Sequence, residues 1–167
     1  LFHSRKDHTP APAGLRRESL WTPAHHRFEP LTLSLELLRH RLDVWHAVDF
    51  IPPYRGARRH VITIHDLNFL LFPQFLTAES RRYYNGQIHR AAGSADHILT
   101  ISESSKRDIV AHLGVDESRI TVHLCGVGPE FFPQPPDVCA RIRKELQLPA
   151  RYILFVGTFE PRKNIRG

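Results

Sequence analysis

The chain has 167 residues, of which 41% are hydrophobic and 24% are charged, and its formal net charge is +6. This composition indicates a globular protein and excludes a disordered one, and no apolar run approaches the ~20 residues of a membrane span. The two cysteines are too few for a disulfide framework, and the basic charge favours anionic partners such as phosphates, acidic membrane surfaces or nucleic acid.

Residues 1–30 are rich in Pro, His and Arg and predict a loop or a partly ordered segment. Beyond them, stretches with apolar residues at helical spacing alternate with short β-branched runs. The stretches with helical spacing predict helices over 31–42, 76–95, 102–114 and 137–148. The short apolar runs predict strands over 43–49, 60–66, 96–102, 119–124 and 151–157.

This alternation predicts an α/β fold, in which a Rossmann-like parallel sheet is flanked by helices. In such sheets ligands bind at the carboxyl ends of the strands. Three predicted strands end in polar residues, which are His65 with Asp66, Ser102 with Glu103, and Gly157 followed by Arg162 and Lys163. We therefore expect these residues, Ser102 included, to line a cleft.

Each of these polar groups also has an ordinary structural explanation. His65 is equally explained as a packed or helix-capping histidine, and Ser102 as the N-cap of the helix that follows it. Arg162 and Lys163 are equally explained as a solvated turn. The twelve histidines lack the spacing of metal ligands, so we expect no metal site.

The segment 104–124 also has the pattern of a helix-turn-helix, in which a polar second helix would bind DNA. Ile120, Val122 and Leu124 alternate with polar residues, however, and this is the period of a strand. A β-branched run at 96–102 also precedes the motif, where such a domain needs another helix. DNA binding is therefore the alternative from another class, and we expect no nucleic-acid partner.

Four motifs resemble glycosyltransferase family 4 in their order and spacing. They are "DVWHAVD" at 43–49, "VITIHDL" at 61–67, "ADHILTISESSKRDIVAHLGVDESRITVHLCGVGPEFF" at 95–132 and "YILFVGTFEPRKNI" at 152–165. The resemblance implies the two-domain GT-B fold, with this chain supplying its N-terminal half. It also implies a retaining transfer of a sugar from a nucleotide-diphosphate donor, without a metal or another cofactor.

The resemblance assigns roles residue by residue. His65 matches the histidine that lines the cleft near the reacting sugar, and Asp66 matches its neighbour, which has a more structural role. Gly157 matches the glycine that lets the donor approach the backbone. Arg162 and Lys163 match the basic pair of the second domain, in which the lysine reaches the donor diphosphate.

Because the sequence contains no methionine, we interpret it as a fragment that lacks sequence at both ends. On this interpretation 1–30 is a partial N-terminal segment, 31–150 is an acceptor-side domain, and 151–167 is the first strand and basic turn of a truncated donor-side domain. The chain departs from the family at 125–128, where "Cys-Gly-Val-Gly" replaces "Asn-Gly-Val-Asp". The family's first strand and glycine-rich loop are also not recognisable in 1–30.

The sequence therefore predicts part of a glycosyltransferase that transfers a sugar to a glycan or a lipid-linked acceptor, and the motifs favour mannose. We expect a cytoplasmic protein, either free in the cytosol or loosely attached to the inner membrane face through its basic N-terminal half. A sugar-nucleotide epimerase of the same fold is the nearer alternative. We expect the 167 residues alone to be inactive, since half of the cleft would be missing.

Overall fold

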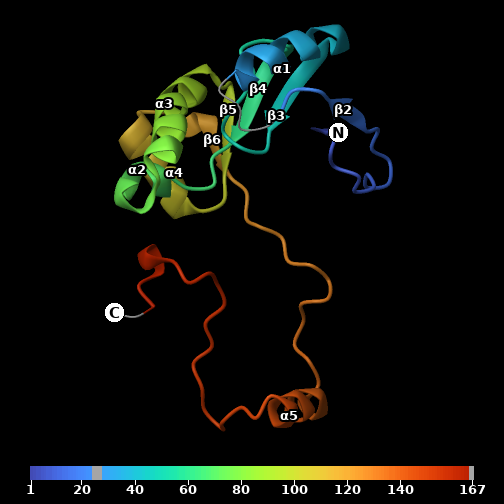
Figure 1. Ribbon diagram of the computed structural model, residues 1–167, viewed down its shortest axis with the longest axis vertical. Coiled ribbons are helices and arrows are strands. Elements are labelled where there is room, and N and C mark those ends of the chain that lie inside the picture. The colour runs from blue at the N-terminus through green and yellow to red at the C-terminus, as the bar shows by residue number, and fades with distance from the viewer. Residues whose placement is uncertain (24–27, 166–167) are drawn as a thin grey trace. The chain divides into compact units, whose positions relative to one another are not determined.

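The computed structural model describes residues 1–23 and 28–165, and it divides the chain into two compact units (Figure 1). The first unit is Leu1–Leu124 and the second is Cys125–Gly167. The domain boundary near residue 150 that the sequence suggested stays a prediction. Each unit is described by itself below.

The first unit is built around a sheet of four parallel strands in the order β3-β4-β5-β6 (Figure 1). The strands are β3 (Leu42–Ala47), β4 (Ala57–Thr63), β5 (His97–Thr100) and β6 (Ile120–Val122). Their register places Ile62, Ile98 and Ile120 side by side across three strands, and all three are buried. Full burial of such a side chain contributes about 1.5–3 kcal/mol, so this row fixes the face that the sheet turns to the core.

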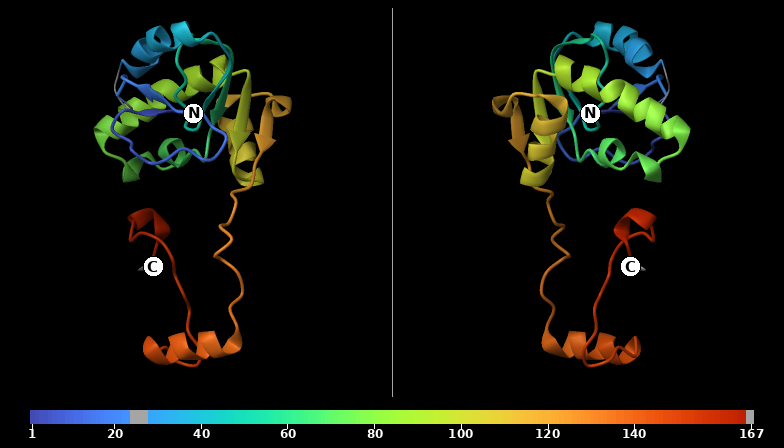
Figure 2. Two further views of the ribbon diagram at one scale, coloured as in Figure 1. Left: turned by 90° about the vertical axis from the view of Figure 1, so that its right-hand side faces the viewer. Right: turned by 90° about the vertical axis from the view of Figure 1, so that its left-hand side faces the viewer.

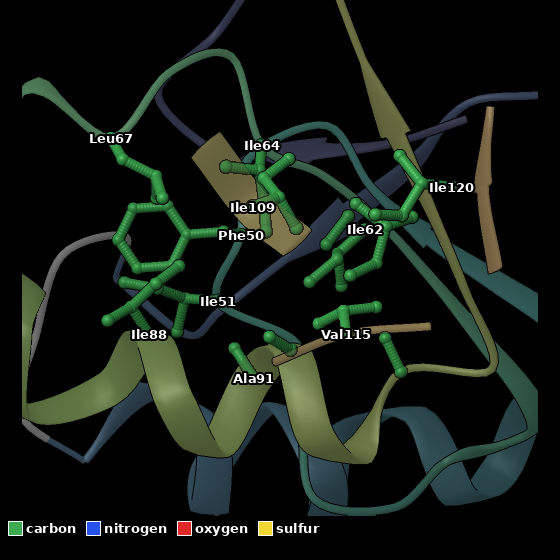
Figure 3. Close-up of a cluster of buried hydrophobic side chains, with 14 residues drawn as sticks. Phe50, Ile51, Ile62, Ile64, Leu67, Ile88, Ala91, Ile109, Val115 and Ile120 are labelled. Carbon is green, nitrogen blue, oxygen red and sulfur yellow. The ribbon is translucent and has the colours of Figure 1, made fainter. Parts of the chain in front are cut away.

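β3 and β4 are joined by residues 48–56 without a helix, whereas helices precede β3 and connect β4 to β5 and β5 to β6. They are α1 (Glu29–Leu37) with its 3₁₀ extension (Leu38–His40), α2 (Asn68–Leu71), α3 (Ala78–Ser94) and α4 (Glu103–Leu113). Ile88 and Ala91 of α3 and Ile109 of α4 join the buried strand residues in one cluster (Figure 3). The predicted α/β fold with a parallel sheet flanked by helices is therefore confirmed.

The ends of α4 match the sequence pattern closely. Ser102 is the N-cap, with its hydroxyl oxygen accepting a hydrogen bond from the backbone N–H of Ser105. Gly114 follows the helix at φ 64°, in the left-handed region that glycine adopts without strain. After this helix comes β6 (Ile120–Val122), so the second helix of a helix-turn-helix does not form and that alternative is wrong.

Residues 1–30 contain two short strands that the sequence did not predict. β1 (Phe2–Ser4) and β2 (Glu18–Leu20) form a separate parallel pair. Arg17 holds the intervening loop, since its guanidinium donates to the carbonyl oxygen of Asp7 at 2.9 Å and contacts the His3 ring. The sequences of β1 and β2, Phe-His-Ser and Glu-Ser-Leu, do not alternate apolar and polar residues, which explains why these strands were not predicted. Residues 24–27 of this segment lie outside the described part.

The second unit contains α5 (Pro136–Glu145), which was predicted, and a 3₁₀ turn at Pro161–Lys163. The strand predicted over 151–157 does not form in the described part of the chain, and Ile153 and Val156 are 100% and 86% exposed. A strand needs a neighbour for its N–H and C=O groups, and the described residues of this unit supply none. The interpretation of 151–167 as the start of a donor-side domain stays a prediction.

Candidate functional site

The carboxyl ends of the sheet strands carry the first group of predicted site residues. Ile64 follows β4, and its backbone N–H donates to the carbonyl oxygen of Leu99 at 2.9 Å, which extends the ladder past the strand. His65 and Asp66 come next and are exposed. Ser102 lies just beyond β5. The structure therefore brings His65, Asp66 and Ser102 to the same edge of the first unit.

The His65 side chain is held at this edge by the strand next to its own. Its Nε2 atom lies 3.2 Å from the carbonyl oxygen of Val48, which follows β3. A carbonyl oxygen only accepts, so Nε2 carries the proton and, in the neutral ring, Nδ1 is left as an acceptor. The ring is exposed and is oriented by the residue that follows β3.

The backbone of His65 has a second support that the sequence did not suggest. The Ser105 hydroxyl donates to the carbonyl oxygen of His65 at 2.9 Å, and the Ser102 hydroxyl donates to Ser105 Oγ at 3.1 Å. Ser105 is 7% exposed. Ser102 is thus both the predicted N-cap and a member of a chain of hydrogen bonds that ends at His65. The Ser-x-x-Ser spacing at a helix start was the available signal.

Asp66 has a local structural role. Its Oδ1 atom accepts a hydrogen bond from the backbone N–H of Asn68 at 2.9 Å, at the first residue of α2. This hydrogen bond stabilises the turn that leads from His65 into α2. The more structural role that the family resemblance gives Asp66 stays a prediction.

A hollow of about 540 Å³ lies along β3 and reaches the same edge. Residues 44–49, which include the end of β3 and the two residues after it, line one side, and Phe2, His3 and Ser4 of β1 line another. Val48 belongs to this lining and also binds the His65 ring. There is consequently open space beside the carboxyl end of β3, with His46 and Asp49 as polar groups in its wall.

The second group of predicted site residues lies in the second unit. Arg162 Nε donates to Glu160 Oε2 at 2.5 Å, and the Thr158 hydroxyl donates to Glu160 Oε1 at 2.6 Å. The hydrogen bond from Thr158, followed by that from Arg162, lowers the pKa of the Glu160 carboxyl. Arg162 is therefore engaged in an ion pair with Glu160.

Lys163 differs from Arg162 although the two residues are adjacent. It is exposed and, among residues 1–23 and 28–165, forms no hydrogen bond or ion pair through its ammonium group, although its charge also lowers the pKa of the Glu160 carboxyl. It is the last residue of the 3₁₀ turn. Gly157 is exposed, and an added Cβ there would come within 2.8 Å of the Phe155 ring. The described residues contain no cluster of three metal-ligating side chains.

The sequence model of Glycosyltransferase Family 4 matches residues 2–131, which is most of the chain. The chain belongs to Glycosyltransferase Family 4. The matched region contains His65, Asp66, Ser102 and Ser105, so the whole hydrogen-bonded edge lies in the part that defines the family. Among the described residues, no helix combines the length and apolar character needed to cross a membrane.

Two known proteins are similar to this Family 4 chain. O-antigen chain mannosyltransferase B from Escherichia coli is 31% identical over 156 residues. That match takes in 93% of this chain and 41% of the relative, so the chain spans less than half of the relative's length. The crystal structure of a glycosyltransferase from Rickettsia africae ESF-5 aligns with a TM-score of 0.46 and 14% identity, over 80% of this chain and 36% of that one.

Proposed function

We propose that this chain is the acceptor-side part of a retaining glycosyltransferase that uses a nucleotide-diphosphate sugar. The observation that carries the proposal is the His65 edge. An exposed imidazole is oriented at its ring by Val48 and at its backbone by a buried serine, at the carboxyl ends of parallel strands where ligands bind. A side chain held from two directions is suited to contact a reacting group without moving first.

The name of the E. coli relative supports the choice of sugar and product. That protein is an O-antigen chain mannosyltransferase, so we propose mannose as the transferred sugar and a growing glycan, free or lipid-linked, as the acceptor. A cytoplasmic location belongs to the same proposal. Cys125 and Cys139 are both free and exposed, as is usual for thiols in a reducing compartment.

The proposed reaction breaks the bond between the anomeric carbon and the donor diphosphate and forms a bond from that carbon to an acceptor hydroxyl oxygen, whose proton passes to the departing diphosphate. Negative charge gathers on the departing diphosphate. Lys163, whose ammonium group is free of the ion pair that engages Arg162, is the group we assign to that charge. No metal and no other cofactor is part of the proposed reaction.

Replacing His65 tests the role of the edge. The change His65→Ala is made in an enzyme with a donor-binding half, either the parent protein or a chimera in which this chain replaces the matching 156 residues of the E. coli relative. We expect kcat to fall roughly ten- to a thousandfold, the cost of one positioned contact in the transition state. His112→Ala, at an exposed position in α4, is the control and should leave kcat unchanged. Equal rates in both variants would contradict the role of His65.

Product analysis in the same assay separates transfer from epimerisation. Nucleotide sugars that include GDP-mannose and UDP-glucose are incubated with and without a mannan acceptor. A transferase consumes the donor fastest when acceptor is present and lengthens the acceptor. Formation of an isomeric nucleotide sugar that needs no acceptor would support the epimerase alternative instead.

Replacing Lys163 tests the donor side. We expect Lys163→Ala to weaken donor binding and slow transfer by about ten- to a hundredfold combined, because a charge-assisted hydrogen bond contributes about 1.5–3 kcal/mol. Arg162→Ala is the matched control and should do less, since its guanidinium is already bound to Glu160. Donor titration by calorimetry measures both. Unchanged donor affinity in Lys163→Ala would remove the diphosphate role.

A further inference from the structure

The hollow beside β3 is continuous with the edge that carries His65. Its volume of about 540 Å³ lies within the range of small-molecule sites. Val48 forms part of its wall, and the carbonyl oxygen of the same residue holds the His65 ring. Figures 1 and 2 show the N-terminal segment, in blue, on the β3 side of the sheet, where Phe2 and Ser4 belong to the opposite wall. A molecule in this hollow would therefore reach the His65 edge.

The wall of this hollow carries carboxylates but no basic side chain of lysine or arginine. Among the described residues, Glu29 and Asp49 line it, and neither a lysine nor an arginine does. This contrasts with the whole chain, whose formal net charge is +6. Sites that bind phosphate use lysine or arginine, and a like charge in the wall disfavours an anion. The lining therefore favours a neutral ligand.

Asp49 is the carboxylate of this wall that directly follows Val48 in the chain. Its Oδ1 atom accepts a hydrogen bond from the backbone N–H of Phe50 at 2.7 Å. Phe50 is 5% exposed and belongs to the buried core cluster, so the Asp49 side chain is tied to a fixed part of the fold. Its Oδ2 atom forms no hydrogen bond or ion pair with residues 1–23 and 28–165. One carboxylate oxygen is thus bound to the protein and the other is open to a ligand.

The rest of the wall combines a second carboxylate with aromatic rings. Glu29 Oε2 accepts a hydrogen bond from the Tyr83 hydroxyl at 3.4 Å, so it is already engaged by the fold. The rings of Phe2 and Trp45, whose centres are 5.3 Å apart, also line the hollow. A sugar offers hydroxyl donors to a carboxylate and the C–H groups of its ring to aromatic side chains. The hollow therefore has the groups that an uncharged sugar needs.

We propose that this hollow binds the uncharged sugar end of the acceptor glycan, with Asp49 Oδ2 accepting a hydrogen bond from one of its hydroxyl groups. The inference rests on the proposed transferase function and narrows its acceptor. The terminal sugars of the glycan are recognised here, whereas the diphosphate of a lipid-linked acceptor lies outside the hollow. Asp49 is a binding residue and takes no proton in the reaction. A free oligosaccharide is then a sufficient acceptor.

Binding of mannotriose to the full 167-residue chain tests the inference without a donor. Trp45 lines the hollow, and Trp21→Phe leaves it as the single tryptophan. We expect mannotriose to change the Trp45 emission with saturation, and rising salt to leave the affinity unchanged because the ligand is neutral. Inorganic phosphate should cause no change and should not displace the sugar. Absence of sugar binding, or displacement of the sugar by phosphate, overturns the inference.

Asp49→Asn tests the carboxylate itself. The side-chain oxygen of asparagine can still accept the hydrogen bond from Phe50, so the fold is retained, but an amide nitrogen replaces the free carboxylate oxygen. We expect mannotriose to bind about tenfold more weakly, since a charge-assisted hydrogen bond is lost. Asp43→Asn is the matched control, because Asp43 lies in the same strand, pairs with Arg58 at 3.3 Å and does not line the hollow. Equal affinity in the two variants contradicts the role of Asp49.

Transfer kinetics in the parent protein or the chimera separate this inference from the transferase function. Asp49→Asn should raise the KM for mannotriose as acceptor about tenfold and leave the KM for the donor unchanged, a division that a general loss of structure does not produce. Transfer to a lipid-linked glycan, with none to free mannotriose, overturns the inference while the transferase function stands. Mannotriose binding by the chain, with no transfer by the unmodified chimera, contradicts the transferase function and supports the sugar site.

Discussion

His65 owes its position to two hydrogen bonds that act on different parts of the residue. The Val48 carbonyl orients the ring and the Ser105 hydroxyl holds the main chain. Because Ser105 is nearly buried, its hydrogen bond is shielded from competing water. The position of an exposed catalytic candidate is thereby set by a group inside the protein. Ser105 acts through His65 and is a positioning residue.

The contribution of this support can be measured as stability. Ser105→Ala leaves the His65 carbonyl without its donor and removes the partner of Ser102, so we expect a loss of about 1–3 kcal/mol in the free energy of unfolding. Ser104→Ala, one residue earlier on the exposed side of α4, should stay within about 0.5 kcal/mol. Urea denaturation of the two variants measures the difference. Equal stability of both would show that the hydrogen bond to His65 contributes nothing.

The elements of the first unit follow from the sequence where a period is long enough to be recognised. Ile62, Ile98 and Ile120 lie in strands whose sequences either alternate apolar and polar residues or are continuously apolar. The two ends of α4 are indicated by Ser102 at its start and Gly114 after its last residue. β1, β2 and α2 have three or four residues each and show no such pattern. The strand predicted over 151–157 does not form for a different reason. The apolar side chains follow a strand pattern there, but a strand also needs a neighbouring strand for its backbone hydrogen bonds.

The candidate site could be predicted only in part for a related reason. Strand ends indicated His65, Asp66 and Ser102, because the carboxyl ends of parallel strands share an edge. The roles of Val48 and Ser105 depend on which atoms face each other across three elements, and no local pattern encodes that. The assignments of Gly157, Arg162 and Lys163 rest on family resemblance and stay predictions.

Replacing glycine by alanine should change the free energy of unfolding in opposite directions at two positions, one just after a helix and one inside a helix. Gly114 ends α4 at φ 64°, where an alanine Cβ is strained, so Gly114→Ala should destabilise the chain by about 1 kcal/mol. Gly93 lies inside α3 with nothing within 4 Å of an added Cβ, so Gly93→Ala should stabilise it by about 0.5–1 kcal/mol. Thermal or urea unfolding gives both signs. A destabilised Gly93→Ala would mean that α3 is not a regular helix there.

At the scale of the whole molecule, stability is concentrated in the first unit. Every member of the buried core cluster, from Ala47 to Ile120, lies within Leu1–Leu124. The second unit contrasts with it, since α5 buries none of its residues and Leu154 and Phe159 are 73% and 84% exposed. The free energy of unfolding should therefore be a property of the first 124 residues.

Truncation after Leu124 tests this expectation. We expect the chain of residues 1–124 to unfold in urea with a free energy within about 0.5 kcal/mol of the full chain, because no core side chain is removed. Its m-value should be nearly unchanged, since m follows the surface that unfolding exposes. Limited trypsin digestion of the full chain should cut first at exposed Arg and Lys residues in 141–163, because segments with few buried contacts open at low cost. A large loss of stability on truncation, or a first cut within α3 or α4, would show that residues 125–167 contribute to the fold of the first unit.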